Sequence, residues 1–141
     1  DPKTKEYWHK SVGIFIFNNE GKFLIFKLQK YPYKHTIPAG HIDVQETPKD
    51  AAQREALEET ALAISQLSLL GEDEISNDSF RRGSDHHRWF TFQAFVANSD
   101  NLNINDEGIK PMWVTPQEAR KLDLTVPARF VFEKYKAFFP K

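Results

Sequence analysis

The chain has 141 residues, of which 40% are hydrophobic and 28% are charged, and its formal net charge is −1. This length and composition predict a single globular domain over residues 1–141, and they exclude a disordered or fibrous protein. The near-neutral charge argues against a non-specific polyanion binder, so a nucleic-acid partner is not expected. The lack of cysteine excludes metal sites with thiolate ligands. It also suits the reducing cytoplasm, where we expect the protein.

The first half of the chain predicts a hairpin followed by a helix. Aromatic and β-branched residues at 12–17 and 23–28 flank an Asn/Gly turn at 18–21, which indicates two largely buried strands. These runs fall well short of the roughly 20 apolar residues that a membrane-spanning helix needs, so no membrane partner is expected. A loop and a short strand at 36–39 follow. Thr47 and Pro48 then begin a helix to about Thr60, because threonine caps helices and proline suits the first helical position.

The second half predicts further strands and two helices. The strands are expected at 67–75, 88–97 and 110–114, with a polar loop at 76–87 between the first two. The segment Thr115-Pro116-Gln117-Glu118 repeats the capping pattern and opens a short helix through Leu122. A last helix is expected from Pro127 to about Phe139.

Three glutamates are predicted to cluster on the first helix. Glu55, Glu58 and Glu59 fall within an arc of roughly 100°, because residues i, i+3 and i+4 share a helical face. Like charges at this spacing repel, so a cation is needed to favour the cluster. Hard oxygen ligands indicate Mg²⁺, for which Mn²⁺ can substitute. Taken alone, the glutamates would fit a solvated helix face better, and it is their flanking residues that favour a metal site.

Three flanking residues support this interpretation. Arg54 lies one turn from Glu58, and its guanidinium can orient carboxylates while offsetting their repulsion. Gly40 is expected to allow a loop conformation closed to other residues, which would let its carbonyl approach a metal closely. Glu46, just before the helix cap, is expected to return a fourth carboxylate to the site.

Residues 40–62 resemble the Nudix box. That pattern is Gly, five residues, Glu, seven residues, Arg-Glu, an aliphatic residue, any residue, Glu-Glu, any residue, Gly and an aliphatic residue. The matching residues are Gly40, Glu46, Arg54, Glu55, Glu58, Glu59 and Leu62. Ala61 replaces the second glycine, for which we expect a modest change at the helix end, and Ala56 is a small version of the aliphatic residue. The resemblance implies the Nudix fold, an α/β/α sandwich around a mixed β-sheet.

The resemblance also implies an activity. It is that of a Mg²⁺-dependent hydrolase that cleaves the pyrophosphate linkage of a nucleoside diphosphate derivative, such as a nucleoside triphosphate or an oxidised nucleotide. The implied catalytic residues are Glu55, Arg54 and Glu58, with Glu55 or a later glutamate as general base. The implied metal ligands are Gly40, Glu55, Glu58, Glu59 and the later Glu107.

Four further residues are candidates for binding the small nucleotide substrate. Tyr33 and His35 precede the box and are expected to line the nucleoside pocket. Arg81 can meet phosphates, and His87 can recognise substrate or transfer a proton, although adjacent histidines on a strand face opposite sides. A solvated loop without a role fits these residues as well.

Several alternatives remain. A non-catalytic Nudix-like domain that senses a nucleotide differs from the enzyme in class. An ADP-ribose-like substrate ranks lower, because Asn77 replaces a proline that the ADP-ribose group carries, and a dinucleoside polyphosphate lacks the tyrosine that would support it. An RNA-directed activity is disfavoured by the net charge and the short chain. A homodimer is left open.

Overall fold

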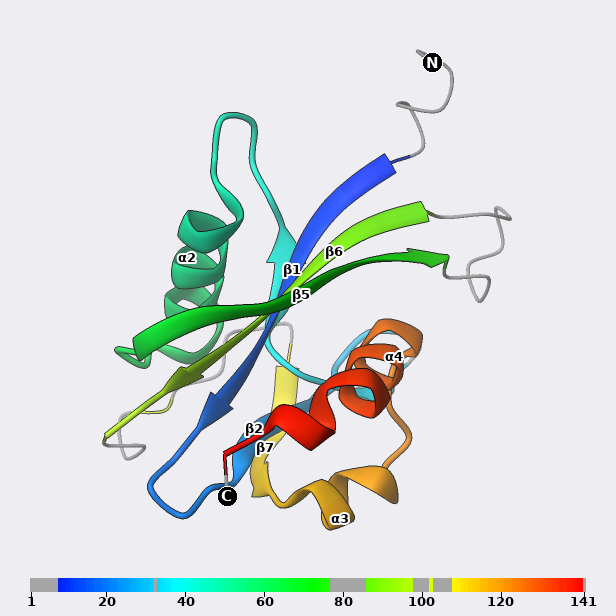
Figure 1. Cartoon of the computed structure of the whole chain (residues 1–141). Coiled ribbons are helices and arrows are strands. Elements are labelled where there is room, and N and C mark those ends of the chain that lie inside the picture. The colour runs from blue at the N-terminus through cyan, green and yellow to red at the C-terminus, as the bar shows by residue number, and fades with distance from the viewer. Residues whose placement is uncertain (1–7, 32, 77–85, 98–101, 103–107, 141) are drawn as a thin grey trace.

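The computed structural model describes the chain except residues 1–7, 32, 77–85, 98–101, 103–107 and 141, and except the side chains of residues 8, 9, 76, 86 and 87. Its elements in chain order are β1 (Trp8–Phe17), β2 (Phe23–Leu28), β3 (His35–Thr36), β4 (Ala39–His41), α2 (Pro48–Thr60), β5 (Ser65–Ser76), β6 (His86–Phe95), β7 (Gly108–Val114), α3 (Pro116–Arg120), α4 (Val126–Tyr135) and the 3-10 helix η2 (Lys136–Phe138). A mixed sheet flanked by helices confirms the predicted fold class (Figure 1).

Strand β1 lies at the centre of the sheet, whose order is β3-β2-β1-β6-β5. β1 runs parallel to β6 along its whole length, from Trp8 opposite His86 to Phe17 opposite Phe95. β4 pairs antiparallel with β1, which places Gly40 opposite Val12. β7 pairs antiparallel with β2. This arrangement brings β4 to the edge of the sheet that α2 packs beside (Figure 1).

The predicted hairpin forms, but its two strands separate at once. Phe17 opposite Phe23 is the register pair between β1 and β2, and the Asn18 amide donates to the Lys22 carbonyl at 2.9 Å to close the turn. Beyond it, β1 pairs with β6 and β4, whereas β2 pairs with β7 and β3. Buried backbone groups must find partners, and these other strands supply them. The predicted hairpin is therefore confirmed at its turn, whereas most of each strand pairs with other strands.

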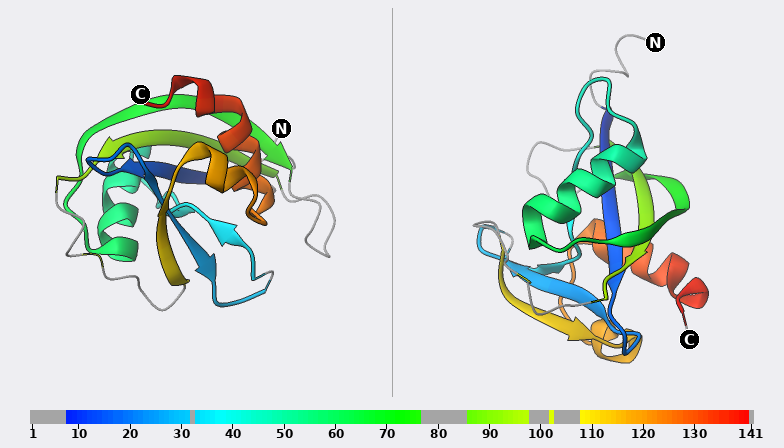
Figure 2. Two further views of the ribbon diagram at one scale, coloured as in Figure 1. Left: turned by 90° about the horizontal axis from the view of Figure 1, so that it is seen from below. Right: turned by 90° about the vertical axis from the view of Figure 1, so that its left-hand side faces the viewer.

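Each face of the sheet carries its own apolar core, because successive side chains of β1 point to opposite faces. Val12, Ile14 and Ile16 pack with three alanines of α2 on one face. Phe15 and Phe17 pack on the other face with residues of α4. Figure 2 shows α2 and α4 on opposite sides of the sheet. A strand buried on both faces explains the unbroken apolar run at residues 12–17.

Two glycines let aromatic rings approach the sheet closely. A Cβ atom on Gly13 would lie 2.6 Å from the Trp89 ring, and one on Gly71 would meet the Tyr135 hydroxyl. The Tyr135 hydroxyl donates to Asp73 Oδ2 at 2.6 Å, and Lys134 pairs with the same carboxylate. These contacts fix α4 over β5.

Most predicted elements are confirmed with shifted ends. β1 begins at Trp8 rather than Val12, because the polar residues before Val12 pair with β6 without showing an apolar pattern. The short helix ends at Arg120 rather than Leu122, and the last helix gives way to η2 after Tyr135. Among the described residues, no helix is long and apolar enough to cross a membrane.

Candidate active site

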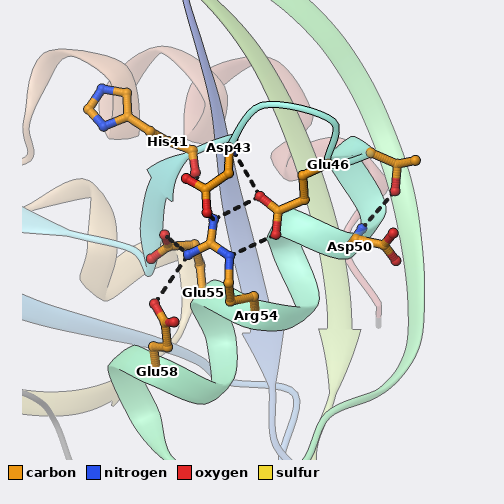
Figure 3. A network of polar contacts seen from close by, with 8 residues as sticks. His41, Asp43, Glu46, Asp50, Arg54, Glu55 and Glu58 are labelled. Carbon is orange, nitrogen blue, oxygen red and sulfur yellow. Dashed lines mark hydrogen bonds and ion pairs between the residues drawn. The ribbon is translucent and has the colours of Figure 1, made fainter.

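Helix α2 packs on the sheet through small side chains, and its charged side lies beside β4. Thr47 caps the helix by accepting a hydrogen bond from the Asp50 amide at 3.1 Å, and Pro48 occupies the first turn, as predicted. Ala51, Ala52 and Ala56 are fully buried against β1 and its neighbours. The remaining side of the helix therefore presents its charged residues next to β4 (Figure 3).

Arg54 bonds to three glutamates at once (Figure 3). Its Nε and Nη2 atoms donate to the two carboxylate oxygens of Glu46 at 2.7 and 2.9 Å. Its Nη1 atom donates to Glu55 at 2.8 Å and to Glu58 at 3.2 Å. The planar guanidinium suits this geometry, because it holds several oxygens in one plane. Arg54 thus offsets the mutual repulsion of the glutamates.

The same arginine fixes the loop that precedes α2. Its Nη2 atom donates to the His41 carbonyl at 2.9 Å and lies 3.6 Å from Asp43 Oδ2. The Asp43 amide in turn donates to Glu46 Oε1 at 2.9 Å. The loop and the helix are therefore held as one unit. Sequence reasoning missed the parts played by His41 and Asp43, since a backbone carbonyl leaves no side-chain signal and Asp43 occupies a position where the box pattern accepts any residue.

The network shifts two ionisation equilibria in opposite directions. The hydrogen bonds from Arg54, and then the one from the Asp43 amide, lower the pKa of Glu46 to about 2. The bonds to Glu46 and then Glu55 raise the pKa of Arg54 further above its ordinary value, against the effect of burial. A carboxylate with so low a pKa is a weak base. Glu46 therefore holds Arg54 in place rather than accepting protons.

Gly40 is a glycine for a different reason from the one expected. Its φ angle lies outside the left-handed region, and it sits in β4 with ordinary strand pairing. A Cβ atom at Gly40 would instead lie 2.1 Å from Cδ of Glu55 and 2.3 Å from its Oε2. The expectation of a special backbone conformation was wrong. The glycine provides the space that the Glu55 carboxylate occupies.

The three helix glutamates lie at different depths. Glu59 is 6% exposed, and its Oε1 accepts a hydrogen bond from the Ala39 amide at 3.1 Å. The Glu55 side chain is 12% exposed and that of Glu58 is 57% exposed. Within the described part of the chain, no three acidic or histidine side chains converge in a geometry that could hold a metal ion. Shared binding of a cation would require side-chain rotations.

The predicted substrate residues are placed only in part. Tyr33 is exposed in the loop before β3, and His35 begins β3 with its Nδ1 atom buried and without a hydrogen-bond partner. Arg81 and Glu107 lie outside the described residues, as does the side chain of His87, although the backbone of His87 belongs to β6. Their roles therefore stay predictions, as does that of Asn77, which is also outside the described residues.

Comparison with known proteins gives consistent matches. A family model described as the NUDIX domain matches residues 7–135. An RNA pyrophosphohydrolase of Bartonella henselae is 38% identical over 119 residues, which cover 70% of this chain and 66% of that protein. An ADP-ribose pyrophosphatase of Methanocaldococcus jannaschii is 35% identical over 72 residues, which cover 49% of this chain and 43% of that protein. The chain thus spans no more than about two thirds of either relative.

A solved structure shows the same fold. The NUDIX domain of Shewanella oneidensis NrtR, complexed with ADP ribose, superposes with a TM-score of 0.76 over 97% of this chain and 92% of that chain. The sequence identity is 18%, so this likeness concerns the fold alone.

Proposed function

This chain belongs to the Nudix family, and we propose that it is a pyrophosphohydrolase that cleaves a phosphoric anhydride of a nucleotide with the help of Mg²⁺ or Mn²⁺. One observation carries the proposal. Arg54 holds Glu55 and Glu58 on one side of α2, beside a glycine whose missing side chain makes room for Glu55. This arrangement keeps several carboxylates together, and carboxylate oxygens are the ligands that a hard divalent cation prefers.

The residues present fit a hard divalent cation in their chemistry. Glu55, Glu58 and Glu59 would hold it through carboxylate oxygens, and Gly40 would add its carbonyl. The space opposite Gly40 supports this assignment, because any larger residue there would collide with Glu55. Glu107 is proposed as a further ligand on the resemblance of its segment alone.

The chain's own residues have distinct tasks in the proposed reaction. A bound metal ion would polarise the diphosphate and lower the pKa of an attacking water. Glu55, partly buried and aimed by Arg54, is the proposed general base. Arg54 positions Glu55 and Glu58, and Glu46 keeps Arg54 oriented through a two-point ion pair.

Two substrate classes are supported by relatives. The relative from Bartonella henselae is named for action on RNA and matches a larger part of this chain than the ADP-ribose pyrophosphatase does. The near-neutral net charge weighs against non-specific strand binding, but it leaves room for local recognition of a terminal phosphate. We therefore propose the phosphorylated 5′ end of an RNA as a substrate of equal standing with small nucleotides. Cytoplasmic location and homodimerisation stay predictions.

A panel of substrates tests the proposal. The phosphate-containing hydrolysis products are separated and quantified for a nucleoside triphosphate, ADP-ribose, a dinucleoside tetraphosphate and 5′-triphosphorylated RNA, each with Mg²⁺ and with a chelator. We expect turnover of at least one substrate that the chelator abolishes. Binding without turnover across the panel would support the nucleotide-sensing domain instead.

A further inference from the structure

We propose that Tyr31 and Tyr33 form a stacking platform for two successive bases of a single-stranded RNA substrate. The proposal rests on the hydrolase function above and extends it from the phosphate end to the strand that follows. Both tyrosines lie in the loop between β2 and β3, where their residues are 65% and 58% exposed. Solvent-exposed aromatic rings on a protein surface can stack on nucleobases.

The angle between the two rings decides how many bases they can take. Their centroids are 6.4 Å apart and their planes meet at 89°. Because the two planes are perpendicular, a flat base can stack on only one of the rings, so two bases are needed to occupy both. The matching ligand carries two bases on one phosphate backbone. RNA meets this requirement, and the relative from Bartonella henselae is named for RNA.

Hydrogen bonds anchor the backbone of Tyr33 and close the base of the loop. The Tyr33 amide donates to the Lys30 carbonyl at 2.8 Å, and the Leu28 amide donates to the Lys34 carbonyl at 2.9 Å. Tyr33 has a φ angle of 62°, which is uncommon for a residue with a bulky side chain. Backbone strain of this kind persists only where the surroundings enforce it.

The exit from the loop is anchored as well. The His35 amide donates to the Asp123 carbonyl at 2.8 Å, and the Thr125 amide donates to the His35 carbonyl at 2.9 Å. These bonds tie β3 to the connection between α3 and α4. A platform that is ordered before binding loses little conformational freedom when a strand arrives.

The segment that carries the platform is basic in sequence. Residues 27–35 include Lys27, Lys30 and Lys34 and no acidic residue. Lys34 Nζ lies 3.8 Å from Asp123 Oδ1, a long and partly exposed ion pair that a phosphate can replace. Exposed aromatic rings among lysines are the combination by which proteins bind single strands, with stacking for the bases and charge for the backbone.

The platform lies within reach of the candidate active site. Tyr33 precedes Gly40 by seven positions (40 − 33), and seven extended residues span at most about 25 Å. The chain between them passes directly through β3 into β4. A strand whose terminal phosphates lie at α2 can therefore place a following base on the tyrosines.

A binding measurement tests the platform without hydrolysis. Fluorescence anisotropy of a labelled RNA octanucleotide with a 5′-hydroxyl end is measured with wild type and with Tyr31→Ala and Tyr33→Ala. Each alanine variant is expected to weaken binding on the order of tenfold, the usual loss for one stacked base. Tyr31→Phe should retain binding, because it keeps the ring. Unchanged affinity in both alanine variants would overturn the proposal.

A matched control separates stacking from general surface effects. Phe138 is 69% exposed and lies on η2, outside the loop, so Phe138→Ala removes a comparable exposed ring. We expect RNA binding by this variant to equal that of wild type. An equal loss from all three alanine variants would mean that RNA adheres to exposed rings without a defined site, which contradicts the platform.

Kinetics distinguish the platform from the proposed function. With 5′-triphosphorylated RNA, the two tyrosine-to-alanine variants should raise KM about tenfold and leave kcat unchanged. With a nucleoside triphosphate, Tyr31→Ala should change neither constant. Loss confined to a dinucleoside tetraphosphate, or equal on every substrate, would overturn the RNA assignment. If wild type cleaves no substrate, the proposed hydrolase fails, while the binding measurement still decides the platform.

Discussion

At the scale of single residues, Arg54 organises the candidate site. Its guanidinium donates hydrogen bonds to Glu46, Glu55 and Glu58 and to the backbone carbonyl of His41 in β4. One side chain thus connects the helix to β4. Lysine could not reproduce this, because an ammonium lacks the planar two-point geometry. The glutamates around Arg54 therefore have roles that differ by position although they share one charge.

The first prediction concerns Glu58, whose carboxylate is the most exposed of the three on α2. Glu58→Gln should lower kcat by orders of magnitude, because it removes a charged metal ligand, and should leave the melting temperature nearly unchanged. Glu133→Gln, at an exposed position on α4, is the matched control and should retain activity. Near-normal turnover in Glu58→Gln would contradict the assigned site.

The second prediction concerns the space at Gly40. Gly40→Ala should lower the free energy of unfolding by about 1–3 kcal/mol, because the new methyl group collides with the Glu55 carboxylate. Glu55→Ala removes the colliding group, so the cost of Gly40→Ala should largely vanish in that background. Denaturant unfolding of the four proteins in this cycle measures the coupling. Additive effects would show that the glycine has another purpose.

At the scale of elements, the end of α2 departs from the pattern that glycine usually fills. Ala61 caps the helix in the left-handed conformation, with φ 61° and ψ 15°, and its amide donates to the Leu57 carbonyl at 2.9 Å. The hydrogen bond is the one that a glycine would make. The methyl group adds strain that glycine would avoid. The expected modest change at the helix end is therefore conformational rather than chemical.

The third prediction follows from this strain. Ala61→Gly should raise the free energy of unfolding by about 1 kcal/mol, because glycine enters the left-handed region without a steric penalty. Ala63→Gly is the control, since Ala63 is exposed and is not among the residues with positive φ. That variant should be neutral or destabilised. Thermal unfolding of both variants measures the effect. An Ala61→Gly variant that is no more stable than wild type would contradict the argument.

Sequence reasoning succeeded where the signal is local. The cap at Thr47, the helix that follows and the contact of Arg54 with Glu58 one turn away all depend on residues that are near each other in the sequence. The partners of β1 depend on residues far along the chain, and a hairpin pattern contains no information about a parallel strand near residue 90. Gly40 was recognised for its position, but its reason requires knowing where the Glu55 side chain lies.

At the scale of the whole molecule, α4 is tied to β5 by a charged contact beneath it. Tyr135 donates to Asp73, and Lys134 pairs with the same carboxylate. Burial, together with the hydrogen bond to Asp73, raises the pKa of Tyr135 above its ordinary value. The neutral phenol is thus favoured in the folded protein, and this contact joins the last helix to the far edge of the sheet.

The fourth prediction is a stability change at alkaline pH. The folded-state pKa of Tyr135 is raised, so its contribution is fully present below the unfolded value of about 10 and declines as pH rises beyond it. The free energy of unfolding of wild type should fall above that pH. Tyr135→Phe should have a lower free energy of unfolding at pH 8 but lose less of it as pH rises, because phenylalanine does not ionise. Urea unfolding at pH 8 and pH 11 checks this. Parallel losses in both proteins would contradict it.

The central position of β1 also has a consequence for the order of events during synthesis. Helix α2 rests on a surface to which both β1 and β6 contribute, and β6 begins only at His86. When the residues of α2 leave the ribosome during synthesis, β6 has not yet been made, so the surface on which the helix packs is incomplete. We therefore expect the glutamate-bearing helix to dock only after β6 has paired with β1.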